Sequence, residues 1–212
     1  TEKIKETSGG ITFSLDDKYI FYSKLDKFHR PRKIFRHKIG NSIKEDELIF
    51  EEKSEAFTVN IGLSSDEKYF FISTSDHNTS EQYYFEVNEK NPKPKLIKER
   101  KKGIIYSVNS WDGYFYNHTN ENAEDFKIDR CKDLSNQSWE TYISAKDEVL
   151  IGGLVFLNDW VIRSETSNAL GKLFIKNKNL NKEEELIFSD EKVIVPGISL
   201  VQKDKNTDIV YL

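Results

Sequence analysis

The hydrophobic and polar positions of the chain follow one pattern that returns five times. Each copy reads as an apolar strand, a short acidic turn and an aromatic strand, and these are the signals of strands joined by tight turns. The copies are Ile11–Ser23, Ile61–Ser73, Tyr106–His118, Gly153–Glu165 and Ile198–Tyr211. Their first residues lie 45 to 50 positions apart. A strand repeat of this length is typical of β-propeller blades.

Each repeat predicts four strands, and the second copy shows the pattern most clearly. The innermost strand is Phe57–Leu63, and the turn Ser64–Lys68 leads to a second strand at Tyr69–Thr74. Serine and aspartate suit such a turn because their side chains bond to nearby backbone groups. After the polar loop Asp76–Ser80, the third strand is Gln82–Val87 and the outer strand is Lys95–Lys98. Proline and charge are tolerated near an outer strand because it is an edge.

The other repeats predict third and outer strands at matching places. The third strands are Lys33–Ile39, Asp125–Arg130 and Lys172–Lys176, and the outer strands are Asp46–Glu51, Trp139–Ser144 and Glu184–Ser189. The pattern therefore predicts an all-β fold, a partial β-propeller with about four complete four-stranded blades and half-blades at both ends. The blades lie near residues 11–52, 57–100, 104–145 and 149–190, with a partial blade at 193–212 and the last strand of a preceding blade at Thr1–Glu6.

We interpret residues 1–212 as a single propeller fragment. A closed propeller protects its edges by meeting itself, whereas half-blades leave edges open. We therefore expect the chain to be part of a longer protein. Two alternatives remain open: Thr1–Glu6 pairs with Val193–Leu212 and closes a smaller ring, or the open edges pair between copies and form a homodimer.

Composition narrows the classes of partner and compartment. Hydrophobic residues make up 37% and aromatic residues 13% of 212, so we expect a packed core despite 32% charged residues. The net charge of −4 argues against a nucleic-acid partner. A single cysteine, Cys131, excludes an intrachain disulfide and favours a reducing compartment. No apolar run is long enough to span a membrane, and the first ten residues lack the apolar segment of a signal peptide. We expect a cytoplasmic protein without a membrane partner, in which the glycosylation sequons at Asn78, Asn117 and Asn136 are chance matches.

The sequence contains no motif for catalysis, metal binding or a cofactor. It has no G-x-S-x-G pentapeptide, which would place a nucleophilic serine on a strained turn. The four histidines, at 29, 37, 77 and 118, have no metal-ligand spacing, and we interpret them as loop or strand-surface residues. No dinucleotide or phosphate-binding glycine pattern occurs. We predict no catalytic, cofactor-binding or metal-binding residue in this chain.

Three other groups of residues have a structural interpretation. The acidic pairs Asp16-Asp17 and Asp66-Glu67 occupy the repeated turn, which indicates a turn rather than a catalytic pair. The basic stretches Lys27–Lys38 and Lys95–Lys102 are interpreted as solvated edges, with an inter-domain contact as the alternative. The tryptophans 111, 139 and 160 lie on or beside strands, where core packing is their expected role.

Several segments, in order along the chain, resemble oligopeptidase B (protease II) of the prolyl oligopeptidase family. The main segment is Phe28–Gly40 (FHRPRKIFRHKIG), in which an Arg-Pro pair leads to a strand with Arg-His and a final glycine. The further segments are Thr7–Ser14, Asp17–Ser23, Leu48–Lys53, Phe57–Val59, Thr79–Glu81, Arg100–Tyr106, Phe115–Asn117, Asn122–Ile128, Val149–Arg163, Ile187–Asp190 and Asp208–Leu212. Together they extend over essentially the whole chain.

The resemblance implies the middle of a seven-bladed propeller that caps an α/β-hydrolase domain. In that family the hydrolase domain has a Ser-Asp-His triad and cleaves oligopeptides after Arg or Lys, and the propeller excludes folded proteins. The triad and the acidic residues that determine specificity belong to regions outside this chain, so no catalytic residue is carried over. The resemblance implies a hydrolase-domain partner, in the same chain or a separate one, and predicts that this chain alone is inactive. The alternative function is a non-enzymatic interaction propeller or scaffold, because a fold does not determine a function.

Overall fold

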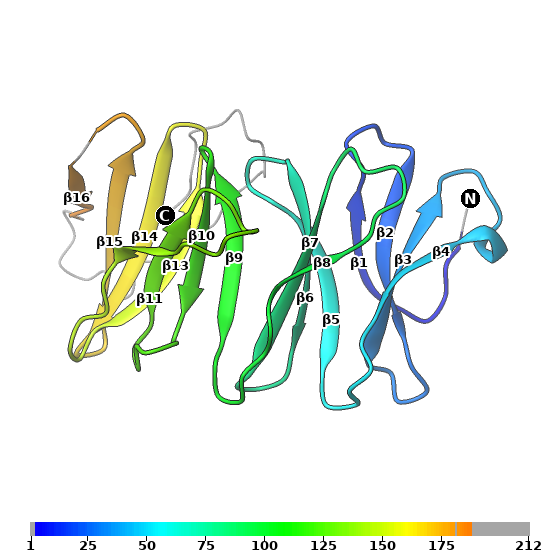
Figure 1. The fold of residues 1–212 in the computed structure, drawn as a ribbon, viewed down its shortest axis with the longest axis horizontal. Helices are drawn as coiled ribbons and strands as arrows, with labels where there is room; N and C mark the ends of the chain where they lie inside the picture. The colour runs from blue at the N-terminus through cyan, green and yellow to red at the C-terminus, as the bar shows by residue number, and fades with distance from the viewer. Residues whose placement is uncertain (1–2, 181, 188–212) are drawn as a thin grey trace. The chain divides into compact units, whose positions relative to one another are not determined.

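The computed structural model describes residues 3–180 and 182–187, and in this part of the chain the regular structure is almost entirely strand (Figure 1). It contains the strands β1 to β16 and one short 3-10 helix, η1 (Ile43–Glu45). The chain consists of two compact units, Thr1–Ser107 and Val108–Leu212, whose boundary falls within β9. The all-β prediction is confirmed.

The first unit contains two four-stranded sheets. The first sheet consists of β1 (Thr7–Phe13), β2 (Tyr19–Leu25), β3 (Pro31–Lys38) and β4 (Glu47–Glu51). The second consists of β5 (Thr58–Leu63), β6 (Tyr69–Ser75), β7 (Ser80–Glu86) and β8 (Lys95–Lys98).

Two further sheets follow, and almost all of their residues lie in the second unit. The third sheet consists of β9 (Tyr106–Trp111), β10 (Tyr114–Thr119), β11 (Lys127–Cys131) and β12 (Glu140–Ile143). The fourth consists of β13 (Leu150–Phe156), β14 (Trp160–Ser167), β15 (Leu170–Asn177) and β16 (Glu183–Glu185). Every sheet keeps its strands in chain order, and neighbouring strands such as β1 and β2, β6 and β7, β10 and β11, and β14 and β15 are antiparallel.

The repeated serine–aspartate turn determines where the first two strands of the first two sheets meet. The Ser64 hydroxyl donates to Asp66 Oδ1 at 2.7 Å and accepts from the backbone N–H groups of Lys68 and Tyr69 at 3.0 Å. Glu67 has a φ of 55°, which a tight turn requires. Ser14, Asp16 and Asp17 repeat this arrangement in the first sheet, so the acidic pairs are turn residues, as predicted.

The core of the first unit lies between its two sheets. Phe21 and Ile34 of the first sheet pack with Val59, Phe70, Ile72 and Phe85 of the second. The ring centroids of Phe21 and Phe70 are 4.6 Å apart. These residues alternate along their strands, so one face of each sheet is buried against the other.

The core of the second unit has the same placement but different side chains. Trp111, Tyr116 and Ile128 of the third sheet pack with Ile151, Phe156 and Val161 of the fourth. The Trp111 indole N–H donates to the Leu157 carbonyl at 2.7 Å, so its polar edge is satisfied inside the core. Core packing is confirmed for Trp111, while Trp160 and Trp139 are half-buried.

At the N-terminus the structure differs from the prediction, whereas the elements predicted at the C-terminus lie outside the described residues. Lys3–Glu6, the described part of the strand expected at Thr1–Glu6, are not in a strand, and β1 begins at Thr7. The physical reason is local, because Glu6 has a φ of 59° that interrupts an extended backbone. The partial blade expected at Val193–Leu212, and the end of the outer strand expected at Glu184–Ser189, lie outside the described residues.

Candidate functional site

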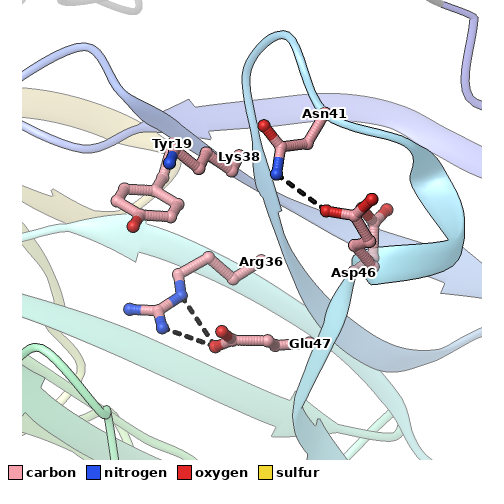
Figure 2. A pocket seen from close by; sticks show the side chains of 7 residues that line it. Tyr19, Arg36, Lys38, Asn41, Asp46 and Glu47 are labelled. Atoms are coloured by element: carbon pink, nitrogen blue, oxygen red, sulfur yellow. Dashed lines mark hydrogen bonds and ion pairs between the residues drawn. The ribbon is translucent and has the colours of Figure 1, made fainter.

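A small polar hollow of about 160 Å³ lies at one end of the first sheet (Figure 2). The start of β2, the end of β3, the connection that contains η1 and the start of β4 all contribute to it. Its lining residues are Tyr19, Arg36, Lys38, Asn41, Glu45, Asp46 and Glu47. The hollow therefore combines two basic and three acidic side chains in a space smaller than most small-molecule sites.

Most of the charge in this hollow is neutralised from within the protein. Arg36 is buried and donates through Nε and Nη2 to Glu47 Oε2, at 3.1 and 2.5 Å. Its Nη1 donates to the Lys90 carbonyl at 2.8 Å, and its guanidinium lies 4.8 Å from the centre of the Tyr19 ring. Figure 2 shows the guanidinium turned toward Glu47. Arg36 therefore fastens the first sheet to the segment before β8.

Behind the hollow, Asp46 bridges a tyrosine and a histidine. It accepts from the Tyr22 hydroxyl at 2.8 Å, and its other oxygen lies 2.6 Å from His37 Nδ1. Burial and the bond to Asp46 raise the pKa of the Tyr22 phenol. An aspartate that orients a histidine resembles part of a catalytic triad. Here His37 is 0% exposed, so a substrate has no access to the imidazole.

The prediction that the histidines lie in loops or on strand surfaces is wrong for His37 and His118. His37 pairs with Ile20 across β2 and β3, and that position is buried. His118 is half-buried, stacks on Phe126 at 4.6 Å and donates from Nε2 to the Ile151 carbonyl at 2.7 Å. Burial lowers the pKa of His118, against the opposing effect of that bond. His29 and His77 are exposed, as predicted.

A buried ionic cluster connects the two sheets of the first unit. Arg100 Nη2 lies 3.0 Å from Glu52 Oε2 and 3.2 Å from Glu81 Oε2, and both glutamates are buried. The guanidinium lies 4.1 Å from the Phe57 ring centre. The Tyr83 hydroxyl donates to Glu81, and its pKa is raised to about 12 by burial and by this bond. The cluster therefore links the connection after β4, which contains Glu52, to the connection after β8, which contains Arg100.

A second ionic cluster lies in the interior of the second unit, around the buried Arg163. Arg163, 4% exposed, donates through Nε to Glu183 at 2.7 Å and also pairs with Glu165. Lys146 pairs with Glu165 as well, and the Arg163 guanidinium lies 4.0 Å from the Phe174 ring centre. Sequence reasoning missed both clusters. The available signal was Arg163 itself, a charged residue at the strand position that Ile72 occupies in the second copy.

Three further candidate features are the possible metal ligands, the single cysteine and the sequon at Asn117. Residues 3–180 and 182–187 contain no group of three His, Cys, Asp or Glu side chains placed to hold a metal ion. Cys131 is buried, and burial raises its thiol pKa to about 11, so the reactive thiolate is disfavoured. Asn117 is 4% exposed on β10, so its sequon is closed to a glycosyl donor in the folded chain.

The basic stretches carry less free charge than their sequence suggests. Arg32 donates twice to the Glu52 carbonyl, and Arg30 donates to the Glu55 carbonyl and pairs with Asp26. At the tip of the β2–β3 hairpin, Phe28 is 55% exposed, with the amino group of Lys27 4.8 Å from its ring centre. The first basic stretch is therefore partly built into the sheet connections.

Within the described part of the chain, no helix is long and apolar enough to cross a membrane.

Comparison with known families identifies the fold. The model of the prolyl oligopeptidase N-terminal β-propeller domain matches residues 1–211. The chain belongs to the prolyl oligopeptidase family. Its four four-stranded sheets are part of that family's propeller, so the partial β-propeller fold predicted above is confirmed.

Two curated proteins are similar to the chain. Protease 2 from Moraxella lacunata is 35% identical over 147 residues, which cover 64% of this chain and 21% of that protein. Dipeptidyl aminopeptidase BI from Pseudoxanthomonas mexicana is 21% identical over 202 residues, which cover 93% and 28%. The chain thus spans between about a fifth and three-tenths of the length of these relatives.

Two solved structures of oligopeptidase B share the fold. Oligopeptidase B from Trypanosoma brucei, in a closed form with covalently bound antipain, superposes with a TM-score of 0.83 at 23% identity, covering 90% of this chain and 28% of that chain. Oligopeptidase B from Leishmania major gives a TM-score of 0.81 at 17% identity, covering 90% and 29%.

Proposed function

We propose that this chain is the propeller portion of a serine oligopeptidase of the oligopeptidase B type, which cleaves oligopeptides after Arg or Lys. The observation that carries the proposal is the family match over residues 1–211. The 35% identity to a relative named Protease 2 supports the peptidase type. The chain alone is inactive in this proposal, and its catalytic partner is an α/β-hydrolase domain in cis or in trans.

The proposed role is exclusion rather than chemistry. A wall that admits flexible peptides and rejects folded proteins needs rigidity and no reactive residue. The internal bonding of Arg36, Asp46, Arg100 and Arg163 supports this role, because these charged groups are held by neighbouring protein groups. The substrates are peptides, and we propose a cytoplasmic protein without a nucleic-acid or membrane partner. We propose in addition that residues 1–212 form one propeller fragment with blades near 11–52, 57–100, 104–145 and 149–190.

The test compares this chain with the native gene product from its own cells. Both are incubated with a serine-reactive fluorophosphonate and with fluorogenic peptides that differ only in an Arg, Lys or Glu before the cleaved bond. We expect the 24.8 kDa chain to be unlabelled and inactive. The native product should be larger, take up the probe and cleave after Arg and Lys but not after Glu.

Each part of the proposal has its own contradicting result. Labelling of a serine within this chain would refute the proposal that the nucleophile lies elsewhere. Cleavage after Glu, or no cleavage after Arg or Lys, would refute the proposed specificity for basic residues but not the proposal of a peptidase. A native product of 24.8 kDa with no co-purifying hydrolase would replace the proposal with the non-enzymatic interaction propeller.

A further inference from the structure

The polar hollow of the first sheet contains one cation and one anion that are not paired with an opposite charge. Lys38 and Glu45 both line the hollow, and both are exposed. Within residues 3–180 and 182–187, neither side chain takes part in an ion pair. Glu45 accepts from the neutral side-chain amide of Asn41 at 2.8 Å. Because the two charges face the same small space, a ligand that carries both signs would satisfy both of them.

Backbone hydrogen bonds hold these two charges on different walls of the hollow. Lys38 ends β3, and its carbonyl accepts from the Asn41 backbone N–H at 3.0 Å, which closes a turn. Glu45 ends η1, and its N–H donates to the Ser42 carbonyl at 2.9 Å. In Figure 2 the Lys38 side chain extends toward the side of the Tyr19 ring, whereas Asn41 lies on the other side. The cation and the anion are therefore kept apart by the fold itself.

The other charged groups of the hollow are already bonded. Arg36 and Glu47 bond to each other, and Asp46 bonds to two side chains behind the hollow. A ligand with only a negative charge would be attracted by Lys38 but repelled by Glu45, and a ligand with only a positive charge would meet the reverse. The hollow therefore favours a zwitterion, in which two opposite charges are a few bonds apart.

The second sheet shows that the repeat does not require this arrangement. Its register places Tyr69 opposite Glu86, where the first sheet has Tyr19 opposite Lys38. The connection between its third and fourth strands, residues 87–94, contains no 3-10 helix that corresponds to η1. A basic wall that faces an acidic wall is therefore a property of the first sheet and not of the blade pattern.

We propose that this hollow binds a small free α-amino acid as a zwitterion, with its carboxylate at Lys38 and its ammonium group at Glu45. The hollow of about 160 Å³ is below the roughly 300–1,000 Å³ of sites for drug-sized ligands, so the side chain of the amino acid is small. Binding is weak, with a dissociation constant on the order of millimolar, because few atoms make contact and both protein charges are exposed. This site goes beyond the proposed peptidase function and does not depend on it, because all of its residues belong to the first sheet and its connections.

An NMR titration of the ¹⁵N-labelled chain with three related ligands tests the proposal. L-alanine carries both charges, N-acetylalanine carries only the carboxylate, and alanine amide carries only the ammonium group. We expect alanine to shift the side-chain amide signal of Asn41 to saturation. Each of the other two ligands should bind about fivefold more weakly, because each loses one exposed ion pair.

Three variants test the orientation of the amino acid. Lys38→Gln should weaken the binding of alanine and N-acetylalanine about fivefold but leave that of alanine amide unchanged, because alanine amide has no carboxylate. Glu45→Gln keeps an acceptor for Asn41 and should weaken alanine and alanine amide but not N-acetylalanine. Lys44→Gln, on η1 but outside the lining of the hollow, is the matched control and should change none of them. All three side chains are exposed, so we expect the thermal unfolding midpoints to stay the same.

Several results would overturn the proposal. A shift that rises without saturation, or no shift, would show that the hollow binds no amino acid. Equal binding of alanine and N-acetylalanine would make the hollow an anion site, and equal binding of alanine and alanine amide would make it a cation site. Equal weakening by Lys44→Gln and Lys38→Gln would assign the attraction to the general surface charge. The ligand series on the unaltered chain decides the question even where a variant unfolds.

Discussion

The sheet pair β1–β8 and the sheet pair β9–β16 share strand order and turn positions but fill their interiors differently. Ile72 pairs with Ile61 and Tyr83 in the first, and its counterpart Arg163 pairs with Leu154 and Phe174 in the second. The first interior is built around phenylalanines, whereas the second contains a guanidinium.

The difference shows that the repeat determines the strand order and the turns, whereas the side chains of the interior differ from one sheet pair to the other. An apolar centre stabilises the folded chain because its surface is removed from water. A buried ion pair contributes little net free energy, but it is costly to break because the remaining charge has no compensation. Adding a charge to the first interior and removing one from the second should therefore both lower the free energy of unfolding, because each change leaves a buried charge without a partner.

The largest effect is expected from placing an arginine in the first interior. Ile72→Arg puts a charge among Val59, Phe70 and Phe85. The buried carboxylate on the same face, Glu81, already pairs with Arg100 and accepts from Tyr83. We expect a loss of about 5 kcal/mol in the free energy of unfolding, because an unpaired buried charge costs several kcal/mol. Urea unfolding measures it, and Ile72→Val, at about 1 kcal/mol, is the control for altered packing. A loss for Ile72→Arg no larger than this control would show that the first interior accepts charge.

Removing the arginine from the second interior should have the next largest effect. Arg163→Ala leaves Glu183 without its cation and Glu165 with Lys146 alone. We expect a loss of about 3–5 kcal/mol in urea unfolding.

Lys172→Ala is the matched control, because it breaks a pair with Glu185 in which both side chains are more than a third exposed. That change should cost less than about 1 kcal/mol. Equal losses for the two variants would mean that the burial of Arg163 has no energetic consequence.

The serine turn distinguishes the two sheets of the first pair on a smaller scale. Ser64→Ala removes the acceptor for the N–H groups of Lys68 and Tyr69. We expect a loss of about 1 kcal/mol, since two backbone donors lose a partner. Ser14→Ala removes a similar set of bonds at a more exposed site and should cost less. A larger loss for Ser14→Ala would contradict the role of burial.

The smallest effect is a pH dependence in the second pair. Burial lowers the pKa of His118, so the unfolded chain binds its proton more readily than the folded chain does. The stability associated with the neutral ring is complete above the unfolded value of 6.5 and is lost as the pH falls through the folded value.

NMR titration of the ring protons, with urea unfolding at several pH values, measures this dependence. His118→Gln keeps a donor near the Ile151 carbonyl and should remove this part of the slope. An unchanged slope in the variant would assign the dependence to another group.

The strands were predictable because their signals are local. The serine–aspartate turns, the proline-rich segment before Lys95–Lys98 and the alternation along β7 lie within single repeats. The burial of His37 and Arg163 was not predictable, because it depends on which residues a strand register or a facing sheet brings to them. Glu6 shows the same limit, since one backbone angle ends a strand that the residue types allow.

The candidate site was the least predictable part. The hollow at Arg36 depends on η1, three residues with no helical period, and on a carbonyl from Lys90, 54 positions away. Charge alone suggested a solvated edge along Lys27–Lys38. The structure instead uses Arg30, Arg32 and Arg36 of this stretch to hold other segments.

The sequential strand order has a consequence for cleavage of the chain. Because each sheet bonds only strands that are neighbours in sequence, a protease cut between β4 and β5 severs none of the strand pairings. The sheets on either side of such a nick would keep their backbone hydrogen bonds and remain together through side chains alone, at Phe21, Phe70 and Arg100. A nicked first unit should therefore migrate as two pieces only after denaturation.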